Sequence, residues 1–182
     1  MRLATIATYL SDFAWFWPGV AISVVASVGL ARRVGSALGG GRLTGAALVF
    51  SVGLIVSATL TPSREALRFG AVGSGTCDLS RLGLAALHDV VTLGDPGFNI
   101  LLFLPFGLVL ATLPRSRFAP FLVAAIILPP AIEATQLLVG VLDRACQSSD
   151  VVDNLTGLVI GLAIGRAVVW LRGRRGPDDA GG

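Results

Sequence analysis

Hydrophobic residues are concentrated in five long segments, separated by polar and arginine-containing connections. The segments cover roughly residues 13–31, 43–61, 98–113, 118–140 and 151–171. About 20 helical residues, each rising about 1.5 Å, are needed to cross the hydrocarbon core of a bilayer. The third segment is short on this count, so we expect it to begin earlier or to meet locally thinned bilayer. The pattern predicts an all-α integral membrane helix bundle of about five transmembrane helices, forming a single domain over residues 1–172.

Composition agrees with the membrane class. Of the 182 residues, 54% are hydrophobic and only 14% are charged, and the mean hydropathy is +0.81. A soluble domain of this size needs more charged surface than these residues supply. We therefore expect the lipid bilayer to be the main partner of the chain.

Arginines are distributed unevenly between alternate connections. The first connection, the third connection and the C-terminal end contain Arg32, Arg33, Arg42, Arg115, Arg117, Arg166, Arg172, Arg174 and Arg175. In the other two connections, arginines are mixed with Asp and Glu. Cytoplasmic connections carry an excess of basic residues, so the pattern predicts that the N-terminus is outside and the C-terminus inside. The formal net charge of +3 reflects this orientation, and no nucleic-acid partner is expected.

The long outer connection over residues 62–97 contains apolar residues at helical spacing. Leu79, Leu82, Ala86, Val90 and Leu93 form this stripe, which predicts an interfacial amphipathic helix over residues 79–93. The polar, glycine-rich residues 173–182 are expected to form a disordered tail.

Two cysteines, Cys77 and Cys146, fall in predicted outer connections. An oxidising exterior would permit a disulfide that ties the long connection to the short one before the last span. The alternative is two unpaired thiols, because a sequence does not show whether they lie within bonding distance.

Glu133 and Gln136 lie three residues apart in a hydrophobic segment, directly after Pro129 and Pro130. An ionisable group at membrane depth is costly and usually faces a bundle interior or a cavity, which makes Glu133 a candidate for a functional site. The alternative is a protonated carboxyl group that only links helices by hydrogen bonds.

Other polar residues are expected to reach the same outer leaflet. Asn99 opens the third span, Arg144 lies between the last two spans, and the fifth span begins with Asp150, Asp153 and Asn154. These residues, with Glu133 and Gln136, are the candidate ligand-binding residues. Each has a structural alternative: Asp150 and Asn99 can cap helices, and Arg144 can form an ion pair with Glu133 or Asp150 that only stabilises the fold. Below them, Gly157, Gly161 and Gly165 predict close helix packing.

Taken together, NILLFLPFG at residues 99–107, Glu133-x-x-Gln136, Arg144 and Asp150-x-x-x-Asn154-x-x-Gly157 resemble the VanZ-like family of bacterial membrane proteins. The resemblance covers the chain from Asn99 onward, with the signature in residues 99–165. It departs from the family in the segment Ala145–Ser149 and in the second carboxylate, Asp153. The resemblance implies a multi-pass protein of the bacterial cytoplasmic membrane. The namesake of the family is an accessory protein associated with antibiotic resistance to the glycopeptide teicoplanin, without an established molecular activity.

Three functions remain open. The first is an outer-leaflet pocket that binds a cell-envelope precursor or similar ligand and influences glycopeptide susceptibility. The second is a membrane enzyme, in which Glu133, Asp150 and Asp153 act as acids and bases and Arg144 holds an anionic or lipid-linked substrate. The third is a non-catalytic partner of another membrane protein, docked through the glycine face. We expect no cofactor or metal, because no nucleophile motif, phosphate-binding glycine loop or metal-ligand spacing is present. The lone His88 is weak evidence for acid–base catalysis and for metal binding.

Overall fold

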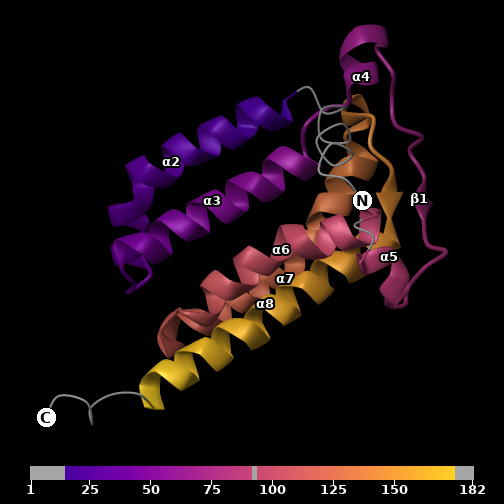
Figure 1. Ribbon diagram of the computed structural model, residues 1–182. Coiled ribbons are helices and arrows are strands. Elements are labelled where there is room, and N and C mark those ends of the chain that lie inside the picture. Colours follow the sequence, from indigo (N-terminus) through magenta and orange to yellow (C-terminus); the bar gives the residue numbers. More distant parts are fainter. Residues whose placement is uncertain (1–14, 92–93, 175–182) are drawn as a thin grey trace, which may run out of the picture.

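The computed structural model describes residues 15–91 and 94–174, which are mostly helical (Figure 1). The long helices in this part of the chain are α2 (Phe16–Ala37), α3 (Arg42–Thr59), α6 (Asp95–Ala111), α7 (Arg115–Leu138) and α8 (Ser148–Arg174). All of them except α6 are long and apolar enough to cross a membrane. The chain is therefore an all-α membrane helix bundle, as its hydrophobic pattern predicts.

Helix α6 begins earlier than the third hydrophobic segment but stays short. It starts at Asp95, where Gly94 is the N-cap residue and Pro96 occupies the first turn, a position at which the missing N–H of proline costs nothing. Its 17 residues span only about 25 Å at about 1.5 Å per residue, against a hydrocarbon core of about 30 Å. Helix α6 alone is therefore shorter than the hydrocarbon core of a bilayer.

The helices form two groups, an α2–α3 hairpin and a cluster of α6, α7 and α8 (Figure 1). In the cluster, α6 packs closely along α8 because glycines remove the side chains between them. A Cβ at Gly157 would collide with the carbonyl of Ile100, and one at Gly161 with the carbonyl of Leu104. The glycine face is thus occupied by α6 of the same chain and is not free to dock another membrane protein, contrary to the third function considered from the sequence.

At one end of the bundle, short elements join the long connection to the segment before α8. The connection contains α4 (Arg64–Phe69), β1 (Cys77–Asp78) and α5 (Leu87–Val91), and η1 (Gly140–Leu142) precedes β2 (Cys146–Gln147). Strands β1 and β2 pair in parallel, with Cys77 opposite Cys146, and these two cysteines form a disulfide.

The amphipathic helix expected over residues 79–93 is mostly not formed. Within the described residues, only Leu87–Val91 are helical, and residues 92–93 lie outside the description. The reason is that other contacts hold the segment in a non-helical conformation. Locally, the Ser80 N–H donates to Asp78 Oδ1 at 2.8 Å, and from a distant part of the chain Ser148 Oγ donates to the carbonyl of Arg81 at 2.9 Å. Hydrophobic spacing alone did not reveal these competing contacts.

The expected tail is shorter than residues 173–182, because α8 continues through Gly173 to Arg174. Residues 175–182, on which the rest of that prediction falls, lie outside the described residues. So do residues 13 and 14 of the first hydrophobic segment.

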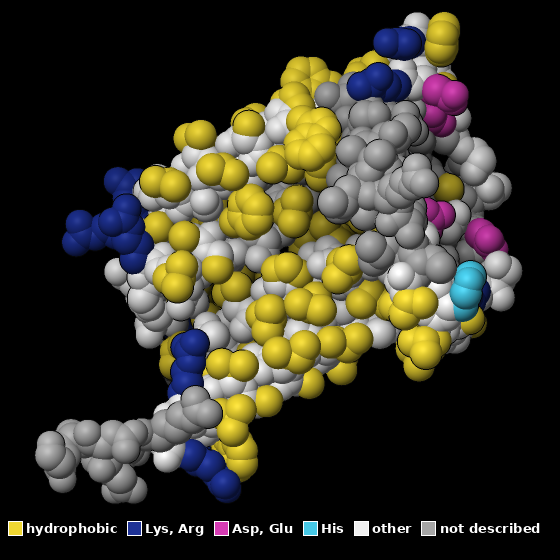
Figure 2. Space-filling view, viewed as in Figure 1, with side chains coloured by type: hydrophobic (Ala, Val, Ile, Leu, Met, Phe, Trp, Pro, Cys, Tyr) yellow, Lys and Arg dark blue, Asp and Glu magenta, His cyan; other side chains and the backbone are white. Residues whose placement is uncertain are grey.

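Charged side chains distinguish the two ends of the bundle (Figure 2). We call the end formed by the α2–α3 and α6–α7 connections and the C-terminus of α8 the arginine end. Its described basic residues include Arg32, Arg33, Arg42, Arg115, Arg117, Arg172 and Arg174. The opposite, loop end carries residues 60–91 and 139–147, where acidic side chains lie among the arginines. Because the helices alternate in direction, the polar first turns of α6 and α8 and the C-terminal turns of α3 and α7 all meet at the loop end.

Candidate functional site

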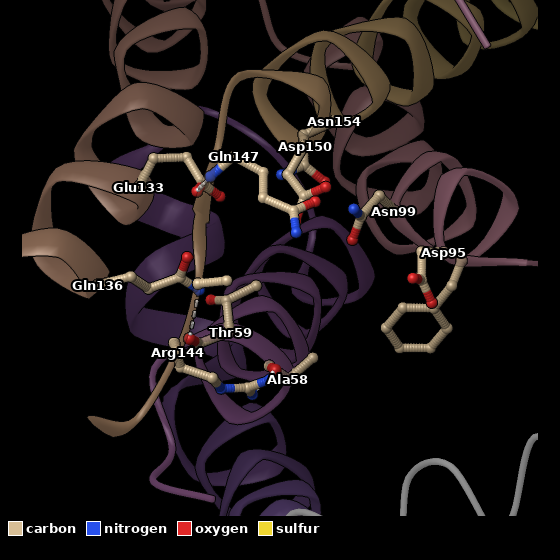
Figure 3. Close-up of a pocket in the computed structure, with 12 residues that line it drawn as sticks. Ala58, Thr59, Asp95, Asn99, Glu133, Gln136, Arg144, Gln147, Asp150 and Asn154 are labelled. Atoms are coloured by element: carbon tan, nitrogen blue, oxygen red, sulfur yellow. Dashed lines mark hydrogen bonds between the residues drawn. The ribbon is translucent and has the colours of Figure 1, made fainter. Parts of the chain in front are cut away.

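A cavity of about 150 Å³ lies at the loop end, between α3, α6, α7 and α8. Three helices each contribute a pair of polar side chains spaced three or four residues apart, which places both members on one helix face. The cavity is lined by Ala58, Thr59, Asp95, Phe98, Asn99, Glu133, Gln136, Arg144, Ala145, Gln147, Asp150 and Asn154 (Figure 3). Segments separated by almost a hundred residues thus form one polar site.

The lining residues differ in exposure from one side of the cavity to the other. Asp95 and Ala145 are exposed, whereas Glu133, Gln136 and Asn154 are buried. The cavity therefore has a mouth near the start of α6 and a floor formed by α7 and α8. A ligand that enters would meet polar groups buried between helices, where each polar contact is energetically strong.

On the floor, two side chains of α7 are held in place by backbone groups. The Gln147 N–H donates to Glu133 Oε2 at 2.8 Å, and Gln136 Nε2 donates to the carbonyl of Thr59 at 2.9 Å. The second bond fixes the orientation of the Gln136 amide, because a carbonyl accepts only from the nitrogen. The oxygen Gln136 Oε1 consequently faces away from Thr59 and toward the cavity (Figure 3).

Arg144 connects the segment before α8 to the end of α3. Its guanidinium group donates to the carbonyl of Thr61, at 3.2 Å from Nε, and to the carbonyl of Ala58. These carbonyls lie at and just beyond the C-terminus of α3, where helix carbonyls lack intrahelical partners and the dipole favours a cation. The ion pairs between the described residues are Arg81–Asp153 and His88–Asp89, so Arg144 forms neither pair considered from the sequence.

Two buried oxygen atoms of the cavity have no hydrogen-bond partner within residues 15–91 and 94–174: Gln136 Oε1 and Asn154 Oδ1. The side chain of Gln136 is 7% exposed and that of Asn154 is 1% exposed. Nearly all buried polar groups in proteins are paired, and an unpaired one costs about 1–3 kcal/mol. These two acceptors, pointing into a shared cavity, indicate that a water or a ligand completes the site.

Asp153 is the candidate residue that does not line the cavity. It is 1% exposed and forms an ion pair with Arg81, whose Nη1 also lies 3.2 Å from Asp153 Oδ1. Hydrogen bonding to this carboxylate raises the pKa of the Arg81 guanidinium above its ordinary value. Asp153 therefore anchors the long connection to α8, beside the cavity.

The structure brings the other candidates, Asn99, Glu133, Gln136, Arg144, Asp150 and Asn154, together around the cavity. Sequence reasoning missed Asp95 and Gln147, as well as the backbone of Ala58 and Thr59. The sequence could have indicated Asp95, because it lies four residues before Asn99 and therefore on the same face of a helix that starts at a proline turn. Gln147 had no such signal, because its backbone N–H is positioned by the two-residue strand β2, whose pairing partner is distant in sequence. Within residues 15–91 and 94–174, no group of three or more His, Cys, Asp or Glu side chains is arranged to hold a metal ion.

Comparison with known proteins supports the relationship suggested by the polar residues. A model of the VanZ/LLP1 family matches residues 47–170. No curated protein and no solved structure matches the chain significantly. The matched range runs from within α3 almost to the end of α8 and contains every residue that lines the cavity.

Proposed function

Because the chain belongs to the VanZ/LLP1 family, we propose that it is a bacterial envelope protein whose cavity binds the polar head group of an envelope-associated molecule. Binding there changes the susceptibility of the cell to glycopeptides of the teicoplanin type. The observation that carries this proposal is the pair of buried, unpartnered oxygens, Gln136 Oε1 and Asn154 Oδ1, that face one cavity. Polar groups that only linked helices would be expected to pair with one another.

The size of the cavity limits what it binds. Pockets that enclose whole drug-sized ligands occupy about 300–1,000 Å³, whereas this cavity measures about 150 Å³. A glycopeptide antibiotic is far larger than this cavity and larger than a drug-sized ligand. The protein therefore acts on a small polar group of an envelope molecule and influences the antibiotic indirectly.

We place the loop end at the outer face of the cytoplasmic membrane. The excess of arginines at the other end supports this orientation, because positively charged ends stay in the cytoplasm. The disulfide between Cys77 and Cys146 at the loop end supports it independently, since disulfides persist in oxidising compartments. The mouth of the cavity then opens where envelope precursors are exposed.

The test is glycopeptide susceptibility in a bacterium that lacks this protein. The strain is complemented with wild type, Glu133→Gln, Arg144→Ala or Asn154→Leu, each at matched membrane levels. We expect wild type to raise teicoplanin resistance and the three variants to lose that effect. No effect of wild type would reject the proposed role in susceptibility.

A matched control separates the cavity from general damage to the bundle. Thr135 precedes Gln136 in α7, and its hydroxyl group donates to the Ala131 carbonyl of its own helix. Thr135→Val is expected to behave like wild type. If it lost resistance as fully as Asn154→Leu, the phenotype would reflect the integrity of α7 rather than the cavity.

A further inference from the structure

The chemistry of the cavity narrows the class of ligand, an inference that rests on the binding role proposed above. Three hydrogen-bond donor groups of the site, on Gln136, Gln147 and Arg144, already have partners inside the protein. Gln136 Nε2 donates to Thr59, the Gln147 N–H to Glu133, and the Arg144 guanidinium to backbone carbonyls. An anionic ligand would need these donors and would have to displace the contacts that fix the floor.

Several hydrogen-bond acceptors of the cavity, in contrast, are available to a ligand. Gln136 Oε1 and Asn154 Oδ1 have no partner, and the carboxyl groups of Asp95, Glu133 and Asp150 line the same cavity. An amide oxygen accepts two hydrogen bonds, and an ionised carboxylate only accepts. The missing partner is therefore a hydrogen-bond donor, and the carboxyl groups favour one that carries positive charge.

We propose that the cavity binds a primary ammonium group, as carried by an ethanolamine lipid head group or by a free amine. An ammonium group is a compact cation with three donors and no acceptor. Its donors suit an orphan amide oxygen on the floor and the carboxyl groups that line the same cavity. The carboxyl groups supply the counter-charge that a buried cation requires. The small volume of the cavity suits a head group of this size.

The position of the acceptors agrees with entry from the outer surface. Asp95 is exposed at the mouth, and Asn154 is buried on the floor beside Asp150 (Figure 3). An ammonium group that enters past Asp95 meets a negative charge first and the uncharged acceptors last. Three carboxyl groups and one guanidinium group, that of Arg144, line the cavity, so ionised carboxyl groups outnumber the cation, and a cleft with such an excess of one sign attracts ligands of the opposite sign.

The experiment uses the purified full chain in detergent, with lipid binding measured by native mass spectrometry. The probes are phosphatidylethanolamine, its monomethyl and dimethyl forms, and phosphatidylcholine. This series keeps the positive charge and removes the N–H donors one at a time. We expect affinity to fall along it, with phosphatidylcholine at least about tenfold weaker, because hydrogen bonds to charged groups contribute about 1.5–3 kcal/mol. Equal affinity for all four lipids would overturn the proposal.

Variants test whether the orphan oxygens cause the discrimination. Asn154→Leu and Gln136→Met remove acceptors and are expected to abolish the preference for phosphatidylethanolamine. Asn154→Asp keeps an acceptor of the same shape and is expected to retain it. Thr135→Val is the neighbouring control, and thermal unfolding confirms that each variant is folded. A preference that survived in folded Asn154→Leu and Gln136→Met would place the ammonium site elsewhere and reject this one.

Two further binding experiments identify the source of the ligand and the sign of its charge. Ethanolamine added as a free amine displaces bound phosphatidylethanolamine if the ammonium group alone is recognised; without displacement, the site is specific for the lipid-borne ammonium. Phosphatidylglycerol is expected to bind more weakly than phosphatidylethanolamine. Tighter binding of phosphatidylglycerol that is lost in Arg144→Ala would show an anion site and overturn the proposal.

The susceptibility assay separates this inference from the proposed function. If Asn154→Leu loses the resistance phenotype although all lipids bind equally, the cavity acts on another ligand and only the ammonium assignment fails. If lipid discrimination follows Asn154 while wild type leaves susceptibility unchanged, the ammonium site stands and the role in glycopeptide resistance fails.

Discussion

Arg81, in the irregular segment between β1 and α5, forms an ion pair with Asp153 in the second turn of α8, 72 residues further along the chain. The Asp153 side chain is 2% exposed and that of Arg81 is 31% exposed. Arg81 thus covers a carboxylate that the bundle would otherwise bury without a counter-charge. The long connection is in this way fixed to the helix that also supplies Asp150 and Asn154 to the cavity.

Replacing Arg81 by Ala is expected to lower the free energy of unfolding by about 3 kcal/mol. This is the lower end of the range for breaking a buried ion pair, because part of Arg81 is exposed. Thermal unfolding in detergent measures the change. Arg68→Ala, at an exposed arginine of the same connection, serves as the control. The double variant Arg81→Ala/Asp153→Ala should be more stable than the sum of the single changes predicts; simple additivity would contradict the pairing.

The disulfide is expected to stabilise the loop end further. Cys77 and Cys146 are 69 residues apart in sequence, so their bond restricts a long loop in the unfolded chain. Replacing both by Ser should lower the free energy of unfolding by about 2–4 kcal/mol. Reductant should lower the melting temperature of wild type and leave that of the double variant unchanged. A melting temperature of wild type that does not respond to reductant would contradict a stabilising role.

The sequence predicted the helices well because their determinants are local. Hydrophobic length gives each span, although α6 starts at Asp95, three residues before the segment expected from residue 98. The glycine pattern of Gly157 and Gly161 indicates a close neighbour but not its identity, which the structure shows to be α6. The expected helix over residues 79–93 was wrong because its stripe of apolar residues is local, while the contacts that override it reach Asp153 and Ser148.

The candidate site was only partly predictable for a related reason. Depth in the membrane follows from sequence position, so the convergence of Asn99, Glu133 and Asp150 on one leaflet could be argued. The sequence could not show which polar groups form hydrogen bonds or ion pairs with one another. Asp153 pairs with Arg81 rather than facing the cavity, and backbone carbonyls of α3 take up the donors of Arg144.

Glycine substitutions in α8 are expected to disrupt the α6–α8 contact. At Gly161, an added Cβ would collide with the carbonyl of Leu104, which is backbone and cannot rotate away. Gly161→Ala should cost about 1–3 kcal/mol of stability. Gly29 in α2 has no neighbour within 4 Å of an added Cβ, so Gly29→Ala should be neutral or stabilise α2 by about 0.5–1 kcal/mol. Thermal unfolding of both variants tests the contrast, and equal destabilisation would contradict the packing.

At Glu133, two substitutions are expected to differ in their effect on stability. Glu133→Gln keeps an oxygen that accepts from the Gln147 N–H, whereas Glu133→Leu leaves that donor without a partner. The Leu variant should therefore lose about 1–3 kcal/mol relative to the Gln variant. Unfolding in detergent measures this difference. Equal stability of the two variants would show that the hydrogen bond contributes nothing to the fold.

The orientation of the bundle can be tested with one added cysteine at each end. Gly83 lies at the loop end and Gly41 at the arginine end, and an added Cβ at either position has no neighbour within 4 Å. Both glycines are exposed, and the native cysteines are bonded to each other, so they do not react with maleimides. In intact cells, a membrane-impermeant maleimide should label Gly83→Cys and not Gly41→Cys, while both should react after the membrane is opened. The reverse pattern would place the mouth of the cavity in the cytoplasm, where envelope head groups outside the membrane could not reach Asn154 or Gln136.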